Sequence, residues 1–480
     1  MAWNFGDILD TIEPVLDPQS MAFIHGDRRV TWGEATRLSN NLARALLSRG
    51  AQPRDKIALY MRNRPEYIIT LSAAFKSRMT HVNINYRYTP DEVWYIFDNS
   101  DAQTVVYASE FRDNIAQIRP RLPNVKNWIE ISMDGQLAPF AEAFEVLTAE
   151  GDGSALKIER SGEDQLFIYT GGTTGMPKGV MWNHDDMREI TLQNERKLGP
   201  VPETYEELRE KMRTAPPMSR LLPAPPLMHG TGLLTAMGAH LNGGCVITLT
   251  GESFDADEML QAIHDHQPTG LVLVGDSFGR PLLNALDANV GKFNVSSVVG
   301  MVSSGVMWSQ EIKRGLLNHM PNAVLSDGFS SSEAIGMGNS IMTKDGEVPT
   351  AKFVLSDRCR VFDENDQPVL PGSGVRGLVA LGPPNPVGYF KDEEKSARTF
   401  RVIDGVRYSI PGDWCEVEAD GSLTLLGRGS ACINTAGEKV FPEEVEEVLK
   451  RHPAIDDALV IGLPDEKWGQ SVTAVVEMVE

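Results

Sequence analysis

Short apolar runs alternate with segments of helical periodicity along most of the chain. In residues 33–48, Leu38, Leu42, Ala45 and Leu46 recur at helical spacing, and Gly50 follows as a stop signal. A second helix is predicted over 65–76. The apolar runs typical of short buried strands are 56–60, 104–107, 166–169, 246–249 and 270–274. Strands separated by helices predict an α/β fold with substantially parallel sheets.

The composition changes near residue 427, after a predicted hairpin that ends at Leu426. Residues 427–430 are small, polar or flexible, and a new helix is predicted to begin at Pro442, followed by strands at 458–461 and 472–478. We therefore predict a large N-terminal domain of several α/β subdomains over 1–426 and a hinge at 427–431. Residues 432–480 are predicted to begin a small, incomplete α+β domain.

Charge and cysteine content narrow the possible functions. The 480 residues include 45 Lys and Arg against 66 Asp and Glu, a net charge of −21, which argues against nucleic acid as the main partner. One local pocket can still bind an anionic small molecule. Four cysteines without a C-x-x-C pair favour reduced thiols in a cytoplasmic protein. Neither a signal-peptide pattern nor an apolar run of about 20 residues is seen, so no transmembrane segment is expected.

The segment 169–179 (YTGGTTGMPKG) carries the strongest chemical signal. It follows a predicted strand and combines glycines, which let backbone N–H groups approach an anion, with threonine hydroxyls and Lys178. The Walker pattern G-x-x-x-x-G-K-[ST] does not fit, because Met176 and Pro177 precede the lysine and Gly179 follows it. These residues predict a phosphate-binding loop of another kind.

The same segment resembles the signature loop of the adenylate-forming superfamily, which includes acyl-CoA synthetases, luciferases and peptide-synthetase adenylation domains. The resemblance implies that a carboxylate is activated with Mg-ATP to an acyl-adenylate and is then usually transferred to a thiol, so ATP, Mg²⁺ and CoA are expected. It implies catalytic roles for Thr174 and Lys178. The implied nucleotide-binding residues of the loop are Thr170, Gly171, Gly172, Thr173 and Gly175.

Further motifs of the superfamily follow in the expected order. Residues 222–230 resemble its P-x-x-H-x-x-G segment, which implies that His229 lies beside the carboxylate pocket; from the residues alone, a buried structural histidine is the commoner case. Ser332 and Glu333 match a hydroxyl that contacts phosphate or carboxylate and an acidic residue near Mg²⁺. The backbone segments that resemble those around adenine contain Ser304, Gly305, Asp327, Gly328 and Phe329, the last in place of the usual tyrosine.

The last matching motifs concern the ribose and the small domain. Residues 409–414 resemble the T-G-D motif, so Asp413 is expected to accept hydrogen bonds from both ribose hydroxyls, although Pro-Gly-Asp is also a common turn. Residues 427–439 resemble the hinge and the first loop of the small domain. Arg428 is then a ribose or phosphate contact, and Gly437 and Lys439 lie on the CoA side. Ser430 stands where the family has a charged hinge residue.

Two questions stay open from the sequence. The family's C-terminal lysine motif is not found before Glu480, so we expect ATP binding with slow adenylation by this chain.

The signature loop is most similar to those of fatty-acyl-CoA synthetases, and Gly238, Ala239, Gly243 and Gly244 suggest space for a hydrophobic acid. Asp276 keeps open an amino-acid substrate, delivery to a carrier-protein phosphopantetheine is a second alternative, and a nucleotide-binding relative without turnover is a third. The oligomeric state is undetermined, and residues 391–398 are expected to form a solvated helix or loop.

Overall fold

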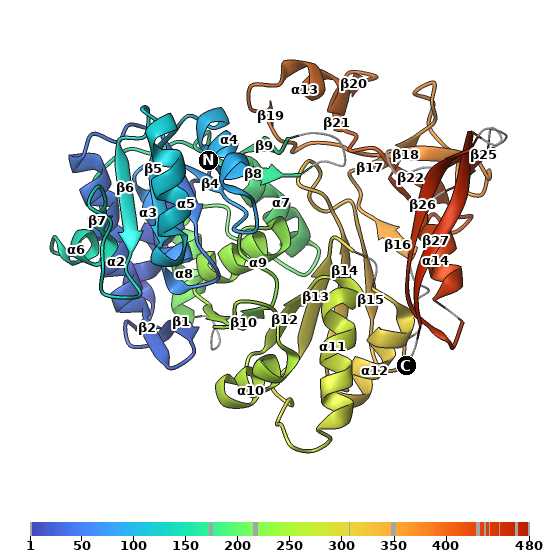
Figure 1. Cartoon of the computed structure of the whole chain (residues 1–480), viewed down its shortest axis with the longest axis horizontal. Helices are drawn as coiled ribbons and strands as arrows, with labels where there is room; N and C mark the ends of the chain where they lie inside the picture. The colour runs from blue at the N-terminus through green and yellow to red at the C-terminus, as the bar shows by residue number, and fades with distance from the viewer. Residues whose placement is uncertain are drawn as a thin grey trace.

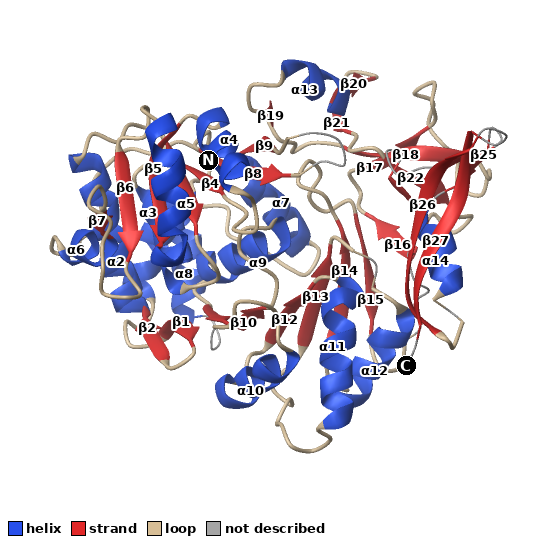
Figure 2. Ribbon diagram, viewed as in Figure 1, coloured by secondary structure: helices blue, strands red, loops and turns tan. Residues whose placement is uncertain are grey.

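Three β-sheets and their covering helices make up the described part of the chain (Figure 1). The computed structural model describes residues 2–171, 176–214, 219–306, 308–346, 352–428, 433–435, 438–440, 442–450, 452–465 and 469–478. Figure 2 shows helices gathered around the sheet that holds β3–β6 and beside β12–β14, whereas the C-terminal part is mainly strand.

The first sheet has eight strands among the described residues and lies at the left of Figure 1. Its inner strands are parallel, and β9 and β19 extend it in antiparallel pairing. Parallel strands need both faces covered, which agrees with the nearly continuous burial of β3 and β4. In order across the sheet the strands are β19 (Gly388–Tyr389), β9 (Lys178–Asn183), β8 (Gln165–Thr170), β4 (Thr80–Asn83), β3 (Lys56–Tyr60), β5 (Ala102–Ala108), β6 (Asn127–Ile131) and β7 (Glu142–Ala143).

The second sheet is parallel from β1 to β14 and antiparallel from β14 onward. Its order is β2 (Arg28–Thr31), β1 (Met21–His25), β11 (Cys245–Thr248), β10 (Arg220–Pro223), β12 (Gly270–Leu273), β13 (Gly300–Ser304), β14 (Val324–Phe329), β15 (Gly338–Met342), β16 (Lys352–Leu355), β23 (Leu423–Arg428), β22 (Asp413–Val417), β18 (Arg376–Leu381), β21 (Val406–Ser409) and β20 (Phe400–Ile403), with β17 (Cys359–Phe362) paired to β18. The expectation of parallel sheets is therefore correct for the first half only, because apolar periodicity does not specify strand direction.

The third sheet is small and C-terminal, and it lies at the right of Figure 1. It contains β25 (Glu438–Val440), β24 (Ile433–Thr435), β27 (Gly469–Met478) and β26 (Ile455–Asp465), and α14 (Pro442–Leu449) packs on β26 and β23. The predicted α/β class with a large N-terminal and a small C-terminal domain is confirmed. The predicted helix start at Pro442 is confirmed as well.

The helices of the large domain pack on the sheets and on one another, and none in the described part of the chain is long and apolar enough to cross a bilayer. They are α1 (Phe5–Ile12), α2 (Trp32–Ser48), α3 (Pro65–Lys76), α4 (Pro90–Asn99), α5 (Arg112–Ile118), α6 (Phe144–Ala149), α7 (His184–Arg196), α8 (Tyr205–Thr214), α9 (Gly230–Leu241), α10 (Ala256–His266), α11 (Gly275–Ala288), α12 (Gln310–His319) and α13 (Glu393–Thr399), with short 3₁₀ turns at Glu13–Val15, Ser109–Phe111 and Arg119–Arg121.

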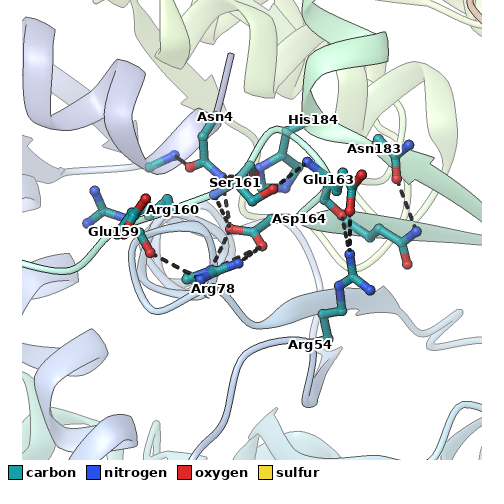
Figure 3. Close-up of polar contacts among 12 residues, drawn as sticks. Asn4, Arg54, Arg78, Glu159, Arg160, Ser161, Glu163, Asp164, Asn183 and His184 are labelled. Carbon is teal, nitrogen blue, oxygen red and sulfur yellow. Dashed lines mark hydrogen bonds and ion pairs between the residues drawn. The ribbon is translucent and has the colours of Figure 1, made fainter. Parts of the chain in front are cut away.

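A buried carboxylate fixes the strand that leads into the glycine-rich segment (Figure 3). Asp164 directly precedes β8 and is 1% exposed. The Arg78 guanidinium donates to both of its oxygens at 3.0 and 3.1 Å, and Asn4 Nδ2 donates at 2.9 Å. The Asp164 carbonyl accepts the N–H of His184 at 2.9 Å, which joins the start of β8 to the end of β9. The N-terminal segment, α3 and the β8–β9 hairpin are therefore held at one point.

Candidate active site

Strands of both large sheets end at a cavity of about 900 Å³. In open α/β sheets, ligands bind at the carboxyl ends of parallel strands, and this cavity lies at the ends of β8, β13 and β14 and at the start of α9. Segments more than 150 residues apart in the sequence meet there. The predicted site residues that line the cavity are Thr170, Gly171, His229, Ser304, Gly305, Gly328, Ser332 and Glu333.

Local backbone geometry explains the glycine at the end of β13. Gly305 has φ +96°, a conformation that residues with a side chain rarely adopt. The preceding Ser303 accepts the N–H of Gly275 through its hydroxyl at 2.8 Å, so the ends of β12 and β13 are held together. The turn can therefore present backbone groups to the cavity.

A second cavity of about 930 Å³ adjoins the first, and both are lined by Ser277, Gly305, Gly328 and Ser330. Predicted adenine-side residues Asp327 and Phe329 line it, and so do residues of α14, β26 and β27. The Asp327 carboxylate accepts Lys313 Nζ at 3.0 Å, and burial raises the pKa of Asp327 although this partner opposes the shift. The Phe329 ring packs against Phe353 with centroids 5.4 Å apart.

Asp413 lies on the wall of the second cavity, at the start of β22. It is 6% exposed, and the preceding Gly412 has φ +102°, so the Pro-Gly turn aims the strand's first residue into the site. Its neighbour in the ladder is Arg428 on β23. A buried carboxylate at this position can accept two hydrogen bonds from vicinal hydroxyls.

Glu333 is held at the first cavity by a residue from outside its own motif. The Tyr389 hydroxyl donates to Glu333 Oε1 at 2.7 Å, and Ser409 Oγ donates to the Glu333 carbonyl at 2.7 Å. The neighbouring Ser332 carbonyl accepts Trp182 Nε1 at 2.8 Å. Glu333 is thus held by strands of both large sheets, and Ser332 by β9 of the first sheet. No cluster of three or more His, Cys, Asp or Glu that could hold a metal occurs in the described part of the chain.

Lys178 begins β9 and forms an ion pair with Asp392, with Nζ and Oδ2 2.9 Å apart. This hydrogen bond raises the pKa of Lys178 and lowers that of Asp392, so both groups stay charged over a wide pH range. An ammonium has three donors and can bind a phosphate oxygen while it keeps this partner.

His229 is the N-cap residue of α9 and faces the cavity. The surrounding protein lowers its pKa, with a further contribution from Arg87, which also lines the cavity. The imidazole is therefore neutral near pH 7 and acts as a polar wall rather than as a cation.

Several predicted residues lie outside the described residues: Gly172, Thr173, Thr174, Gly175 and Gly437. The same holds for most of the predicted hinge and for the side chains of Arg428 and Lys439. The backbone of Arg428 ends β23, and that of Lys439 lies in β25.

Sequence reasoning missed residues in the stretch 388–399. Tyr389 and Lys395 line the first cavity, and Asp392 binds Lys178. The expectation that 391–398 is a solvated segment is wrong for Asp392 and Lys395. A charged helix next to a ligand site has the same pattern as a solvated one, so the sequence offered no signal that separates them.

Part of the first cavity's lining is apolar, namely Leu234, Val274, Phe278, Val302 and Ile335, and Thr231, Thr235 and Ser277 lie among these residues. Gly238 lies on α9, as does Leu234, and has open space where a Cβ would lie. A Cβ on Gly244 would instead meet backbone oxygens of Ser219 and Ala239 within 2.9 Å. Asp276 lines only the second cavity, where its carboxylate accepts the N–H of Ser309 at 2.9 Å. It is therefore not among the residues that line the first cavity, where the sequence left it open as a partner for the ammonium of an amino-acid substrate.

A model of the AMP-binding enzyme family matches residues 15–388, and one of the AMP-binding enzyme C-terminal domain matches 444–480. The chain belongs to the AMP-binding enzyme family. A similar relative is the medium/long-chain-fatty-acid–CoA/3-oxocholest-4-en-26-oate–CoA ligase of Mycolicibacterium smegmatis, 40% identical over 99% of this chain and 87% of that protein. The 3-oxocholest-4-en-26-oate–CoA ligase of Rhodococcus rhodochrous is 37% identical over 98% of this chain and 86% of that protein.

Solved structures share the fold of this AMP-binding enzyme at lower identity. The anthranilate CoA ligase AuaEII with anthranoyl-AMP has a TM-score of 0.84 and 22% identity, over 99% of this chain and 87% of that one. ATP-bound MatB from Rhodopseudomonas palustris has a TM-score of 0.81 and 24% identity, over 99% and 88%. The fold identified from the motifs is therefore that of adenylate-forming enzymes.

Proposed function

We propose that this AMP-binding enzyme is an ATP-dependent acyl-CoA synthetase for a hydrophobic carboxylic acid. In the first step a carboxylate oxygen attacks the α-phosphorus of ATP, which forms an acyl-adenylate and releases pyrophosphate. In the second step the CoA sulfur attacks the acyl carbon, which forms the thioester and releases AMP. The observation that carries the proposal is the 40% identity, over nearly the whole chain, with a relative named as such a ligase.

The acid is proposed to be a medium- or long-chain fatty acid or the side-chain acid of a steroid. The names of the relatives support this class. The cavity supports this substrate class independently. Its volume of about 900 Å³ is close to the upper end for small-molecule sites, and the part of its lining that includes Leu234, Phe278 and Ile335 is apolar.

Each predicted residue keeps its role as part of this proposal. Lys178, Thr174, Ser332 and His229 act on the reacting phosphate and carboxylate, and Asp413 and Arg428 bind the ribose. The phosphate loop comprises Thr170, Gly171, Gly172, Thr173 and Gly175, and the adenine segments comprise Ser304, Gly305, Asp327, Gly328 and Phe329. A preorganised cation beside phosphate oxygens stabilises the charge that develops during adenylation.

Glu333 is the proposed protein ligand for the Mg²⁺ that accompanies ATP. Mg²⁺ is usually bound by one or two carboxylates together with substrate phosphates and water, so a single carboxylate facing the cavity fits this ion. When bound, the ion would neutralise phosphate charge, and the hydrogen bond from Tyr389 fixes the orientation of the carboxylate.

The domain division also belongs to the proposal: residues 1–426 bind ATP and acid, 427–431 form a hinge, and 432–480 begin the mobile domain with Gly437 and Lys439 on the CoA side. Gly427 supports a hinge, since its φ of +129° favours glycine. A cytoplasmic location is proposed as well, and the buried free thiols of Cys245, Cys359 and Cys415 support it.

The test is a substrate panel with ATP, Mg²⁺ and CoA. Acetate, octanoate, palmitate, 3-oxocholest-4-en-26-oate and an amino acid are assayed for pyrophosphate and for acyl-CoA by mass spectrometry. Octanoate, palmitate or the steroid acid should give both products. A parallel reaction from synthetic acyl-adenylate measures thioester formation separately. Turnover of the amino acid alone, or none from either starting point, would contradict the proposal.

A further inference from the structure

Helix α13 brings a lysine to the cavity from a segment that no motif of the sequence marked. Lys395 and Thr399 of this helix line the first cavity, together with Thr170, Gly171 and Glu333. In Figure 1 the helix lies at the top of the view, beside β19 and β20. The helix is thus a wall of the proposed ATP site.

Lys395 forms no ion pair within the described residues, although its charge helps to lower the pKa of the nearby Asp392 carboxyl. Its Nζ lies over the Tyr389 ring, 4.4 Å from the centroid. The acidic residues nearest in sequence are bound elsewhere: Asp392 pairs with Lys178, and Glu394 pairs with Arg398. Lys391, at the other end of the segment, pairs with Asp101 at 2.7 Å. An ammonium group at a cavity wall, whose acidic neighbours are ion-paired with other cations, is suited to an anionic ligand.

Three hydrogen bonds hold Lys395 in this place. The Asp392 carboxylate caps the helix by accepting the Lys395 N–H at 3.0 Å, while its other oxygen holds Lys178. Ser396 Oγ accepts the N–H of Tyr389 at 2.8 Å, and so fixes the ring beneath the ammonium. The Tyr389 hydroxyl in turn donates to Glu333. Lys178, Lys395 and Glu333 are therefore linked through two shared neighbours.

We propose that Lys395 is a second phosphate-binding cation, which acts with Lys178 on the triphosphate of ATP. The inference rests on the proposed ATP-dependent function. In this arrangement Asp392 is a positioning residue, because one carboxylate orders Lys178 and the backbone of Lys395. Tyr389 is a positioning residue for both Lys395 and Glu333.

The experiment measures the dissociation constants of Mg-ATP and of adenosine by calorimetry, without acid or CoA. Lys395→Gln should weaken Mg-ATP binding about tenfold, the effect of one charge-assisted hydrogen bond, and leave adenosine binding unchanged. Lys395→Arg should retain most of the Mg-ATP affinity because it keeps the charge. Lys391→Gln is the matched control and should behave as the parent.

The outcomes separate this inference from the proposed function. If the parent does not bind Mg-ATP, both fail. If the parent binds Mg-ATP and Lys178→Ala weakens it, but Lys395→Gln and Lys391→Gln have equal effects, only the inference fails. It also fails if Lys395→Arg loses as much affinity as Lys395→Gln, or if adenosine binding falls equally, since either result would indicate a packing role.

Discussion

Replacing Asp164 with alanine should destabilise the protein far more than the same change at its neighbour Glu163. The two acids are adjacent and each faces an arginine (Figure 3), but their surroundings differ. The Asp164 side chain is 1% exposed and pairs with Arg78, which is 25% exposed. The Glu163 side chain is 78% exposed and pairs with Arg54, which is 53% exposed.

The expected magnitudes follow from this difference. Breaking a buried ion pair by removing one partner costs about 3–5 kcal/mol, because the other charge remains desolvated. Since water can reach part of Arg78, and Asn4 Nδ2 retains the Ser161 carbonyl as a partner, we expect the lower end, about 3 kcal/mol. An exposed pair contributes about 0–1 kcal/mol, so Glu163→Ala should change stability by no more than that.

The assay is urea-induced unfolding followed by circular dichroism, with a double-mutant cycle of Asp164→Ala and Arg78→Ala. The cycle isolates the pair from effects on the rest of the fold. A coupling energy of about 2 kcal/mol or more is expected. A coupling below about 0.5 kcal/mol, or equal losses for Asp164→Ala and Glu163→Ala, would refute the reasoning from burial.

Three other predictions concern ligand binding and pH. Lys178→Ala should reduce the thermal stabilisation that Mg-ATP gives while the fold stays intact, and equal stabilisation of parent and variant would count against the phosphate role. Asp413→Ala should raise the dissociation constants of ATP and AMP alike in calorimetry, and unchanged constants would contradict the ribose contact. Burial lowers the pKa of His240 to about 3, so it stays neutral in the fold and takes up a proton below about pH 6.5 only when unfolded. Stability should therefore fall by about 1.4 kcal/mol for this residue between pH 7.5 and 5.5, and the loss should be absent in His240→Phe, which can keep the stacking on Trp32.

The apolar pattern along the chain correctly predicted the elements that are almost completely buried. The strand at 56–60 and the helix at 65–76 agree with β3 and α3, because nearly every residue of both is buried. The predicted strands at 458–461 and 472–478 are only parts of β26 and β27, which extend to Ile455–Asp465 and Gly469–Met478. Most of their additional residues are polar or glycine, and Asp456, Asp457 and Gly462 separate Ile455 and Leu463 from the apolar run of β26. The predicted hairpin that ends at Leu426 agrees with the antiparallel pair β22–β23. The pairing of β16 with β23 joins strands far apart in the chain, so the local sequence could not indicate it.

Some residues of the candidate site could likewise be predicted from the sequence, whereas others could not. Gly305 could be assigned from the resemblance of its short motif, and its φ of +96° explains why that motif has a glycine there. The role of Asp392 depends on a partner more than 200 residues earlier, and the position of Lys395 depends on Tyr389 and Ser396 in a segment that reads as a solvated helix. Only the folded chain reveals such contacts.

The net charge of −21 makes cations at the proposed ATP site, such as Lys178 and Lys395, more important for binding. A triphosphate must approach a molecule whose overall field repels it, so binding depends on cations placed within a few ångströms, where solvent screening is least. Asp392 adds a negative charge next to Lys178, and this charge by itself weakens the local positive potential. The same carboxylate accepts the Lys395 N–H, however, and thereby places a second ammonium at the cavity wall. On this reasoning Asp392→Ala, which removes both acceptor oxygens, should disturb both lysines at once and weaken Mg-ATP binding in calorimetry, although it removes a negative charge from the site. Asp392→Asn keeps an acceptor for the Lys395 N–H and should weaken binding less.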